Sequence, residues 1–506
     1  MDGDSGMSLI PLKLPPGIAR NGTDFEQSGR WRDGNLVRWH QGSMRPVGGW
    51  TARTTTGTVS GVARGMLTWT DNSGNSNMAV GTNSNLYYIS ESGGVTDITP
   101  TGFTSGSATA TTNTAYGGGF YGGTTSTTDA NSLYGRAQPS SGIYQEVGIW
   151  ILDNWGEYLI GVTPDDKTIY EWDLNTSNDA TAVSNAPTCS SLVVTEERFV
   201  FALAAGGNPR KVQWCDQEDN TNWTPAATNQ AGDLELQTSG SIMCGVRMRG
   251  RTLILTTTDA HIATYQGAPF VYGIERVGSA CGIASRQTAV AVDEGAFWMG
   301  KKAFFLFDGS VAKELTCEVS DYVFDDINAD QITKSFAVNN SKYGEIWWFY
   351  PSEGSTEVNK YVAFDYKENH WHIGELTRTT GVDAGVFRHP IWLDDSNVFY
   401  NHETGFTHGS DTPFAESAPI SLGNGDQIMK VNQLIPDEAT QGEVKVQFKT
   451  RFYPNDTETT HSLLTMGNPV STRYTGRQLR MKVQGNGNND WRVGTMRIET
   501  KPGGRR

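Results

Sequence analysis

The feature that most constrains the fold is a pair of short apolar strands joined by a polar turn, which recurs along the chain. The second strand of most pairs is rich in aromatic residues, and residues 345–350 (EIWWFY) followed by residues 361–365 (YVAFD) form one such pair. The first strands begin near residues 78, 158, 198, 252, 296, 345 and 390, so most intervals are 40–54 residues. Hairpins at this spacing are typical of propeller blades. We therefore expect an all-β protein with a β-propeller of about six to eight blades over residues 60–414.

The burial of aromatic side chains favours the same fold. One hairpin cannot hide both faces of such strands, whereas blades stacked around an axis hide both faces and leave only short edges. A pair of antiparallel β-sandwiches with similar strand spacing is the alternative fold that the pattern leaves open.

Three segments depart from the repeat. Residues 1–59 contain Pro11, Pro15 and Pro16 and predict an extended N-terminal arm with a hairpin, which lies on a neighbouring domain or subunit. Residues 99–142 are rich in Gly, Ser, Thr and Ala and predict an inserted loop or extension from one blade. Long alternating strands in residues 415–506 predict a C-terminal β-sandwich-like domain.

Charge and cysteine usage narrow the function classes. The net charge is −15, and binding to DNA phosphates needs clusters of Lys and Arg that we do not find. An acidic surface could serve solubility alone, or it could let DNA slide past without sticking. The N-terminus has no secretory signal pattern, no run of 18 apolar residues could span a membrane, and five widely spaced cysteines indicate reduced thiols in a reducing cytoplasm.

Few residues suggest chemistry. His370 and His372 lie two apart on a strand and could share a metal ion with Glu375 or His389, but a structural role fits this aromatic strand better. The adjacent acids at 165–166, 196–197 and 325–326 would point to opposite faces of a strand and are expected in solvated turns. The sequence has no P-loop and no G-x-S-x-G motif, so we predict no catalytic residue, cofactor or metal site.

One turn resembles an element of sialidase propellers. Residues 216–223 (DQEDNTNW) place Asp216 at the start of a polar turn that Trp223 closes. In those proteins the turn is a folding element of blades and not the active site. We cannot assign here the arginine trio and the acidic and tyrosine pair that the sialidase family also needs.

Arginine is concentrated towards the two ends of the chain. Ordinary surface positions would explain this distribution, and so would docking of the chain ends on acidic partners. The candidate interface residues are Arg20, Arg30, Arg32, Arg38, Arg45, Arg505 and Arg506.

Several segments together, and in order, resemble the tail nozzle proteins of short-tailed bacteriophages, a family also described as tail tubular protein B or packaged DNA stabilisation protein. These segments are residues 14–18, 29–50, 295–309, 321–328, 345–351 and 503–506. The resemblance spans most of the chain and is weakest at residues 99–142 and 405–470.

The resemblance implies a non-enzymatic structural subunit of the virion tail, assembled in the host bacterial cytoplasm. It implies a homo-hexameric ring beneath the adaptor protein, a channel for double-stranded DNA, docking of tail fibres or spikes, and a gate that retains packaged DNA. The alternative function is a propeller adhesin or depolymerase that binds or cleaves host glycans. A third hypothesis is a trimeric fibre-attachment or spike-attachment protein.

Overall fold

Antiparallel strands make up almost all of the regular structure in the computed structural model, which describes residues 8–112, 144–422 and 427–503. Within that part of the chain, the other elements are the short helix α1 (Ser320–Phe324) and two 3-10 turns, η1 (Ala205–Gly207) and η2 (Ala329–Lys334). None of the described helices is long and apolar enough to cross a membrane.

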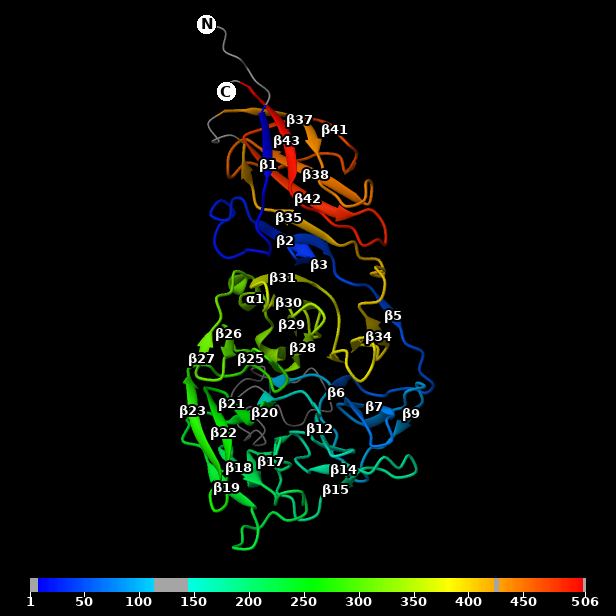
Figure 1. Cartoon of the computed structure of the whole chain (residues 1–506), viewed down its shortest axis with the longest axis vertical. Helices are drawn as coiled ribbons and strands as arrows, with labels where there is room; N and C mark the ends of the chain where they lie inside the picture. Colours follow the sequence, from blue (N-terminus) through cyan, green and yellow to red (C-terminus); the bar gives the residue numbers. More distant parts are fainter. Residues whose placement is uncertain (1–7, 113–143, 423–426, 504–506) are drawn as a thin grey trace, which may run out of the picture.

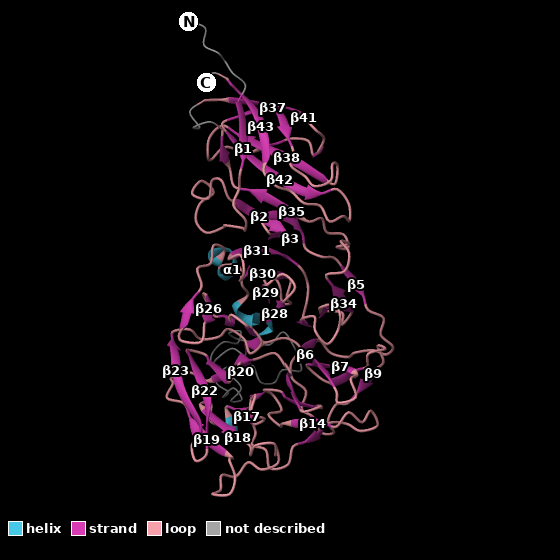
Figure 2. Cartoon of the chain, viewed as in Figure 1, coloured by secondary structure: helices cyan, strands magenta, loops and turns pink. Residues whose placement is uncertain are grey.

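Seven four-stranded sheets, all within the described residues, form the larger part of the molecule (Figures 1 and 2). The strands of blades 1 to 4 are β6 (Ala63–Thr70), β7 (Ser76–Thr82), β8 (Leu86–Ile89) and β9 (Val95–Asp97); β12 (Ile151–Trp155), β13 (Tyr158–Val162), β14 (Tyr170–Trp172) and β15 (Thr181–Ala182); β16 (Ser191–Val194), β17 (Val200–Leu203), β18 (Lys211–Trp214) and β19 (Gly232–Glu235); and β20 (Ile242–Met248), β21 (Arg251–Thr256), β22 (Asp259–Gly267) and β23 (Val271–Ser279). The strands of blades 5 to 7 are β24 (Ala289–Val292), β25 (Gly295–Met299), β26 (Phe304–Phe307) and β27 (Ala312–Glu314); β28 (Phe336–Asn340), β29 (Glu345–Tyr350), β30 (Lys360–Asp365) and β31 (His370–Glu375); and β32 (Thr380–Val382), β33 (Ile391–Leu393), β34 (Phe399–His402) and β5 (Trp50–Ala52).

The seven sheets close into a β-propeller, which confirms the expected fold. The first strand of each blade contacts the first strand of the next blade, and β32 contacts β6 to complete the ring. Blade 7 takes its outermost strand, β5, from the N-terminal segment, with Thr51 paired to Asn401 of β34. Hydrophobic clusters fill the spaces between neighbouring blades. The closed ring leaves only short outer edges.

The C-terminal strands form a two-sheet sandwich that also contains N-terminal strands. One sheet has the order β1 (Ser8–Leu12), β43 (Met496–Pro502), β37 (Met429–Ile435) and β41 (Val470–Gly476). The other has the order β2 (Trp31–Asn35), β35 (Phe414–Ser417), β42 (Gln478–Gly485), β38 (Val444–Arg451) and β39 (Thr459–Thr460), with β36 (Ile420–Ser421) on β42 and β40 (Leu464–Thr465) on β38. The sequence-based division into residues 1–59 and 415–506 therefore separates strands that share these two sheets.

The N-terminal segment connects the sandwich to the propeller (Figure 1). After β2 it forms the hairpin β3 (Val37–His40) and β4 (Ser43–Pro46), and then continues into β5 of blade 7. Strand β2 contacts β31, the outer strand of blade 6. Figure 1 accordingly shows the sandwich beyond blade 6, at one end of an elongated molecule.

The expected insertion at residues 99–142 falls between blades 1 and 2 in the chain. The short strand β10 (Thr111–Thr112) within it pairs with β11 (Tyr144–Gln145), which follows it. The amide N–H of Ala110 and its carbonyl bond to the side chain of Gln331 in η2, at 3.2 and 2.9 Å. Residues 113–143 of the expected insertion lie outside the described residues.

Candidate functional site: the joint between propeller and sandwich

One hydrophobic core runs from blades 5 and 6 into the sandwich. Trp31, Trp39 and Met44 of the N-terminal segment pack in this core. They lie between propeller residues such as Trp348 and sandwich residues such as Met481. Because the side chains of both modules fill one core, the two modules are held together over a wide apolar contact, which we call the joint.

Backbone hydrogen bonds reinforce the joint along the N-terminal segment. The Ile18 amide donates to the carbonyl of Trp371 in β31, and the Glu375 amide donates to the side chain of Asn35, at 2.7 and 2.9 Å. The Leu36 amide donates to the Tyr361 hydroxyl at 3.0 Å. Bonds to backbone groups fix the position of the segment more tightly than apolar packing alone, because hydrogen bonds are directional.

Four of the candidate interface arginines form ion pairs within the chain at the joint. Their pairs are Arg20 with Asp33 at 2.7 Å, Arg30 with Glu318 at 2.5 Å, Arg32 with Asp24 at 2.7 Å and Arg45 with Asp490 at 2.8 Å. Asp33 and Asp24 belong to the N-terminal segment, Glu318 to the propeller and Asp490 to the sandwich. The pairs are partly exposed, so contact of these arginines with a partner stays a prediction. Arg505 and Arg506 lie outside the described residues.

Arg38 is different, because its side chain is completely buried. Its guanidinium donates to Glu345 of β29 at 2.9 Å and to Glu403, just after β34, at 2.6 and 3.1 Å. The ring of Tyr343 stacks on it at 3.8 Å. Arg38 thus joins the N-terminal segment to blades 6 and 7 from inside the molecule, and a surface role for this side chain does not fit its position.

The charges in this cluster stabilise one another. Burial alone raises the pKa of Glu345, but the charge of Arg38 and the neighbouring His372 outweigh burial and lower that pKa to about 2. Burial likewise opposes the charge of Arg38, yet Glu345 and Glu403 raise its pKa above the usual value. Both groups therefore stay ionised, and removing one would leave a buried charge unpaired.

The histidine pair on β31 lies beside this cluster. His372 is buried, with Nε2 3.4 Å from Glu345 Oε1, and His370 lies 3.9 Å from Asp365. The expected third ligands are elsewhere, since Glu375 points to the opposite face of β31 and His389 precedes β33. Among the described residues, no set of three or more His, Cys, Asp or Glu side chains could hold a metal ion.

Burial sets the protonation of the remaining groups near the joint. It raises the pKa of Asp365 to about 6, helped by the charge of Glu345 and opposed by the amides of Glu368 and Lys367. It lowers the pKa of His370, and His372 adds to that effect. Both histidines lie among aromatic rings, with ring centroids of His370 and Trp39 6.2 Å apart and those of His372 and Trp347 5.3 Å apart.

The adjacent acids, which the sequence analysis expected in solvated turns, fix turns and contacts between elements. Asp326 pairs with Lys360 at 2.9 Å, and Glu197 accepts a hydrogen bond from the Tyr272 hydroxyl at 2.9 Å. Asp166 accepts from the Thr104 amide and the Tyr170 hydroxyl at 2.7 and 2.9 Å. Each of these carboxylates therefore has a structural partner.

The turn at residues 216–223 is also structural. The Trp223 indole donates to the Asn220 carbonyl at 2.6 Å and is buried between blades 2 and 3. The Asp216 carboxylate accepts from the amides of Gln217 and Gln230 at 2.9 and 2.8 Å. Asp216 therefore holds the turn in place.

A second charged cluster, which the sequence did not indicate, lies where the insertion meets the propeller. Arg286, in the connection between β23 and β24, donates to the Met243 carbonyl at 2.8 Å and to Glu146 at 3.2 Å. Burial raises the pKa of nearby Asp165; Glu146 adds to that effect and Arg286 opposes it. These residues come from three loops and one strand, so no spacing in the sequence brings them together.

The cysteines are unsuited to nucleophilic chemistry. All five are free thiols, and four are fully buried. Burial raises the pKa of Cys189, Cys215, Cys244 and Cys317 to about 12 and that of Cys281 to about 11. A thiol with such a pKa is almost entirely protonated at neutral pH and is a poor nucleophile.

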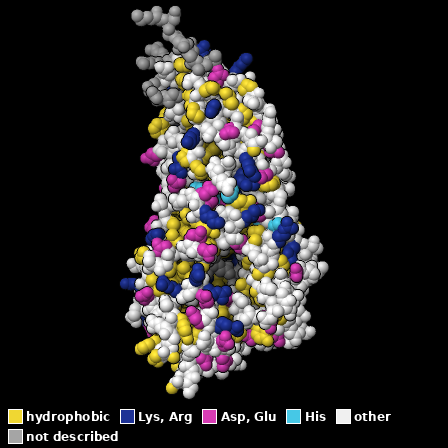
Figure 3. Space-filling model, viewed as in Figure 1, with side chains coloured by type: hydrophobic (Ala, Val, Ile, Leu, Met, Phe, Trp, Pro, Cys, Tyr) yellow, Lys and Arg dark blue, Asp and Glu magenta, His cyan; other side chains and the backbone are white. Residues whose placement is uncertain are grey.

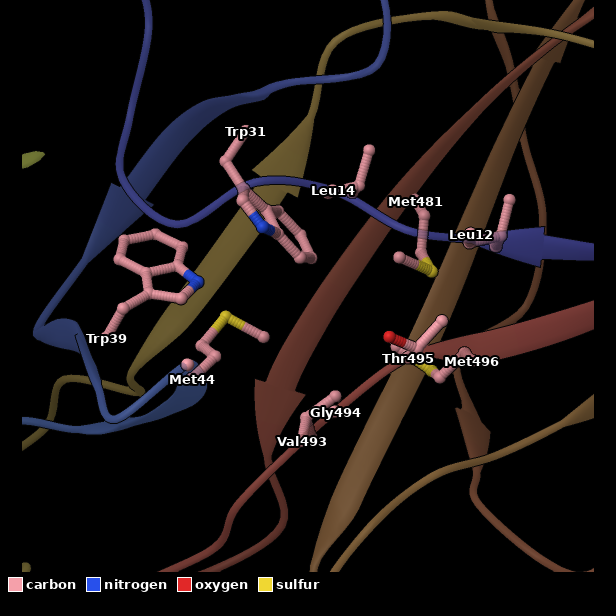
Figure 4. A pocket seen from close by; sticks show the side chains of 11 residues that line it. Leu12, Leu14, Trp31, Trp39, Met44, Met481, Val493, Gly494, Thr495 and Met496 are labelled. Carbon is pink, nitrogen blue, oxygen red and sulfur yellow. The ribbon is translucent and has the colours of Figure 1, made fainter.

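Hollows of different sizes lie in the described part of the chain. A cavity of about 40 Å³ lies inside the joint, between Trp31, Trp39 and Met44 on one side and Met481 and Met496 on the other (Figure 4). This cavity is too small for anything beyond a water-sized molecule. Two larger hollows lie on the propeller surface, one of about 800 Å³ at blade 2 and one of about 560 Å³ at blades 4 and 5.

The surface shows no single-sign patch on the face seen in Figure 3, where basic and acidic side chains are interspersed. A duplex-binding surface would need clustered Lys and Arg. This face therefore lacks the electrostatic footprint of a tight DNA-binding protein.

Comparison with known proteins gives the fold alone. No known protein family and no curated protein matches the chain. Among solved structures, a streptogramin B lyase matches at 8% identity and a TM-score of 0.39, over 69% of this chain and 96% of that one. A glycoside hydrolase matches at 10% and 0.25, over 87% and 98%, and the N-terminal domain of Nup159 at 11% and 0.26, over 79% and 96%. Similarities this weak carry no argument about activity or partners.

Proposed function

We propose that this chain is a structural subunit of the tail nozzle of a short-tailed bacteriophage. In this proposal six copies form a ring and channel in the virion tail, bound to the adaptor protein and to tail fibres or spikes. The ring retains packaged DNA and releases it on ejection. The net charge of −15 supports the proposal, because an acidic wall repels phosphates and lets DNA slide.

The observation that carries the proposal is where the nozzle-like segments meet. Residues 29–50 lie about 245 positions before residues 295–309, 321–328 and 345–351, and each of these segments contributes buried side chains to the joint. These side chains include Trp31, Trp39, Phe297, Phe304, Val323, Ile346 and Trp348. Since the shared segments build a rigid connection and bear no reactive group, a mechanical role fits them best.

The test is a reconstruction of virions that carry a tagged copy of the chain. We expect a six-fold ring at the distal end of the tail. Particles assembled without the chain should lose their packaged DNA, and supply of the intact chain should restore retention. A chain that is absent from virions would overturn the proposal.

The 800 Å³ hollow at blade 2 favours one second candidate, a glycan-binding or glycan-cleaving propeller. Glu171, Asp173 and Asp179 line this hollow. Glycoside hydrolysis commonly uses two carboxyl groups that flank the bond to be cleaved. If the purified chain cleaves host surface polysaccharide, and Asp173→Asn with Asp179→Asn abolishes cleavage without lowering the melting temperature, this second candidate replaces the nozzle.

A further inference from the structure

The hairpin of β22 and β23 presents one aromatic side chain to solvent. Phe270 lies at its turn and is 75% exposed, more than any other large hydrophobic residue in the described ranges. An aromatic ring at a protruding turn is costly to leave in water, and aromatic anchors of this kind carry much of the binding energy in protein interfaces. Phe270 is therefore a candidate anchor, which we call the knob.

The backbone beside the knob is strained and firmly held. Val271 has a φ of 60°, in the left-handed region that β-branched residues avoid, and its side chain is 6% exposed. The next residue, Tyr272, is fixed by its hydroxyl, which donates to Glu197 at 2.9 Å and lies 2.9 Å from the Thr195 hydroxyl. Strain of this kind persists where the surroundings impose it, often at binding sites. The hairpin thus presents Phe270 on a rigid base.

A hollow of about 560 Å³, which we call the hole, lies at the opposite end of the same hairpin. Its wall includes Thr257, Thr258, Ala280, Ala303 and Phe305. The hole is much larger than the cavities of about 150 Å³ that hold one benzene ring. An aromatic side chain and part of its hairpin turn would fit in it.

The knob and the hole cannot meet within one copy. The hole borders the start of β22 at Thr258, and the knob follows its end at Gly267. A nine-residue strand rises about 3.3 Å per residue, so the two features lie roughly 26–30 Å apart. Complementary features at opposite ends of one element are the arrangement that a head-to-tail contact between identical copies requires.

Charges beside the two features are complementary. Lys301 and Lys302 at the rim of the hole are exposed, and Glu314 also lines the hole, so these three side chains carry one net positive charge. Glu197, bound to Tyr272, lies at the base of the knob, and Glu196 precedes it. A net positive rim facing two glutamates would favour docking of knob into hole over other orientations.

We propose that Phe270 of one copy inserts into the hole of a second copy of this chain, in a head-to-tail interface. Only the closure of such contacts into a ring of six rests on the proposed function. In a six-membered ring the distance from the axis to a contact equals the spacing between contacts, so a step of about 26–30 Å places the contacts about that far from the axis.

The experiment compares single substitutions at the knob and at the hole. In sedimentation velocity and native mass spectrometry, we expect Phe270→Ser and Ala303→Trp each to weaken self-association by about 30-fold or more. The melting temperature of Phe270→Ser should stay unchanged, because the side chain is 75% exposed. Tyr453→Ser is the matched control, since Tyr453 is 57% exposed on the sandwich, away from both features.

A mixture of the two variants gives the sharpest readout. Phe270→Ser keeps an intact hole and Ala303→Trp keeps an intact knob, so a head-to-tail interface predicts one-to-one dimers from two variants that are each monomeric. A Phe270→Ser chain that still forms rings overturns the inference and leaves the nozzle proposal standing. Knob-dependent association by a chain absent from virions supports the inference and overturns the nozzle.

Discussion

At the residue scale, the buried guanidinium of Arg38 lies between the carboxylates of Glu345 and Glu403 and links the N-terminal segment to blades 6 and 7. Arg38 and Glu345 are 307 positions apart in the chain and 2.9 Å apart in the structure, and nothing in their local sequence links them. A charged residue near the end of a chain reads as a surface residue, because most charged residues are exposed. Burial of Arg38 between two carboxylates could be inferred only from the fold.

Replacement of Arg38 tests whether this buried cluster holds the joint. Arg38→Met should lower the free energy of unfolding by about 3–5 kcal/mol, because the buried carboxylates of Glu345 and Glu403 would lose their charged partner. Arg45→Met is the control, since its pair with Asp490 is partly exposed and should contribute about 1 kcal/mol or less. Urea denaturation measures both, and equal losses in the two variants would contradict the account.

His402 predicts how stability depends on pH. It is buried, stacked on Trp392 with ring centroids 4.0 Å apart, and accepts a hydrogen bond from Arg378 at 3.0 Å. Burial lowers its pKa well below 6.5, and the charge of Arg378 lowers it further. The folded state therefore binds fewer protons than the unfolded state below pH 6.5, so stability should fall as pH decreases through that value.

A His402→Gln variant should lose part of this pH dependence, measured as the melting temperature between pH 7.5 and 5. Asp365, whose pKa burial raises to about 6, acts in the opposite direction, because its protonated form is favoured in the folded state as the pH falls. Asp365 is unchanged in the variant, so the difference between the two pH profiles isolates His402. Parallel profiles would refute the assignment.

At the element scale, the sequence located the middle of every blade. The seven expected hairpins correspond to the second and third strands of the blades, such as β29 and β30, whose residues are almost all buried. These strands have neighbours on both edges and both faces, so their apolar pattern is strong. Short, exposed outer strands such as β15, which has two residues, were missed, whereas the buried outer strand β31 was recognised from its aromatic residues. The inner strands carry mixed patterns, since part of each faces the axis.

Strand β5 shows what local patterns cannot supply. Its three residues, Trp50–Ala52, are too few to predict a strand, and their partner β34 lies about 350 residues later in the chain. Only ring closure explains why the N-terminal segment is needed in blade 7. The expected arm described the irregular sequence of this segment correctly. The strand β5 within it, which completes blade 7, had no signature in the local sequence.

Removing one backbone donor tests the closure of the ring. The Arg53 amide, just after β5, donates to the Phe399 carbonyl of β34 at 2.7 Å. Arg53→Pro removes this donor and should lower the free energy of unfolding by about 1–3 kcal/mol more than Arg53→Ala, which keeps it. Both variants lose the same side-chain contacts, so thermal denaturation of the pair isolates the backbone bond. Equal melting temperatures would show that β5 does not hold the ring.

At the scale of the whole molecule, the two chain ends build one sandwich. Ser8 pairs with Thr500 and Trp31 with Ser417, so each sheet takes one strand from the N-terminal segment. A sequence read from one end to the other places a domain boundary where composition changes, and the change near residue 415 is real. Two strands about 490 residues apart pair with each other without any change in composition that would reveal the pairing. The sequence-based boundary was therefore too simple.

This topology makes a prediction about fragments. Residues 413–503 alone lack β1 and β2, so each of the two sheets loses an edge strand and the joint loses Leu12 and Trp31 from its core. We expect this fragment to show no cooperative thermal transition in circular dichroism. An isolated sheet with an unpaired edge and exposed apolar residues would also aggregate.

A permuted fragment is the matched comparison. Because Ser8 lies opposite Thr500, a linker of about six Gly and Ser residues can join residue 503 to residue 8, and the chain can continue to residue 50. This single fragment contains every strand of both sheets and should unfold cooperatively, with amide exchange protection in β1 and β43. Cooperative folding of residues 413–503 without the added strands would mean that the sandwich does not need the N-terminal strands to fold. Failure of the permuted fragment would mean that the sandwich depends on the propeller side of the joint, where Trp348 and Trp371 complete its core.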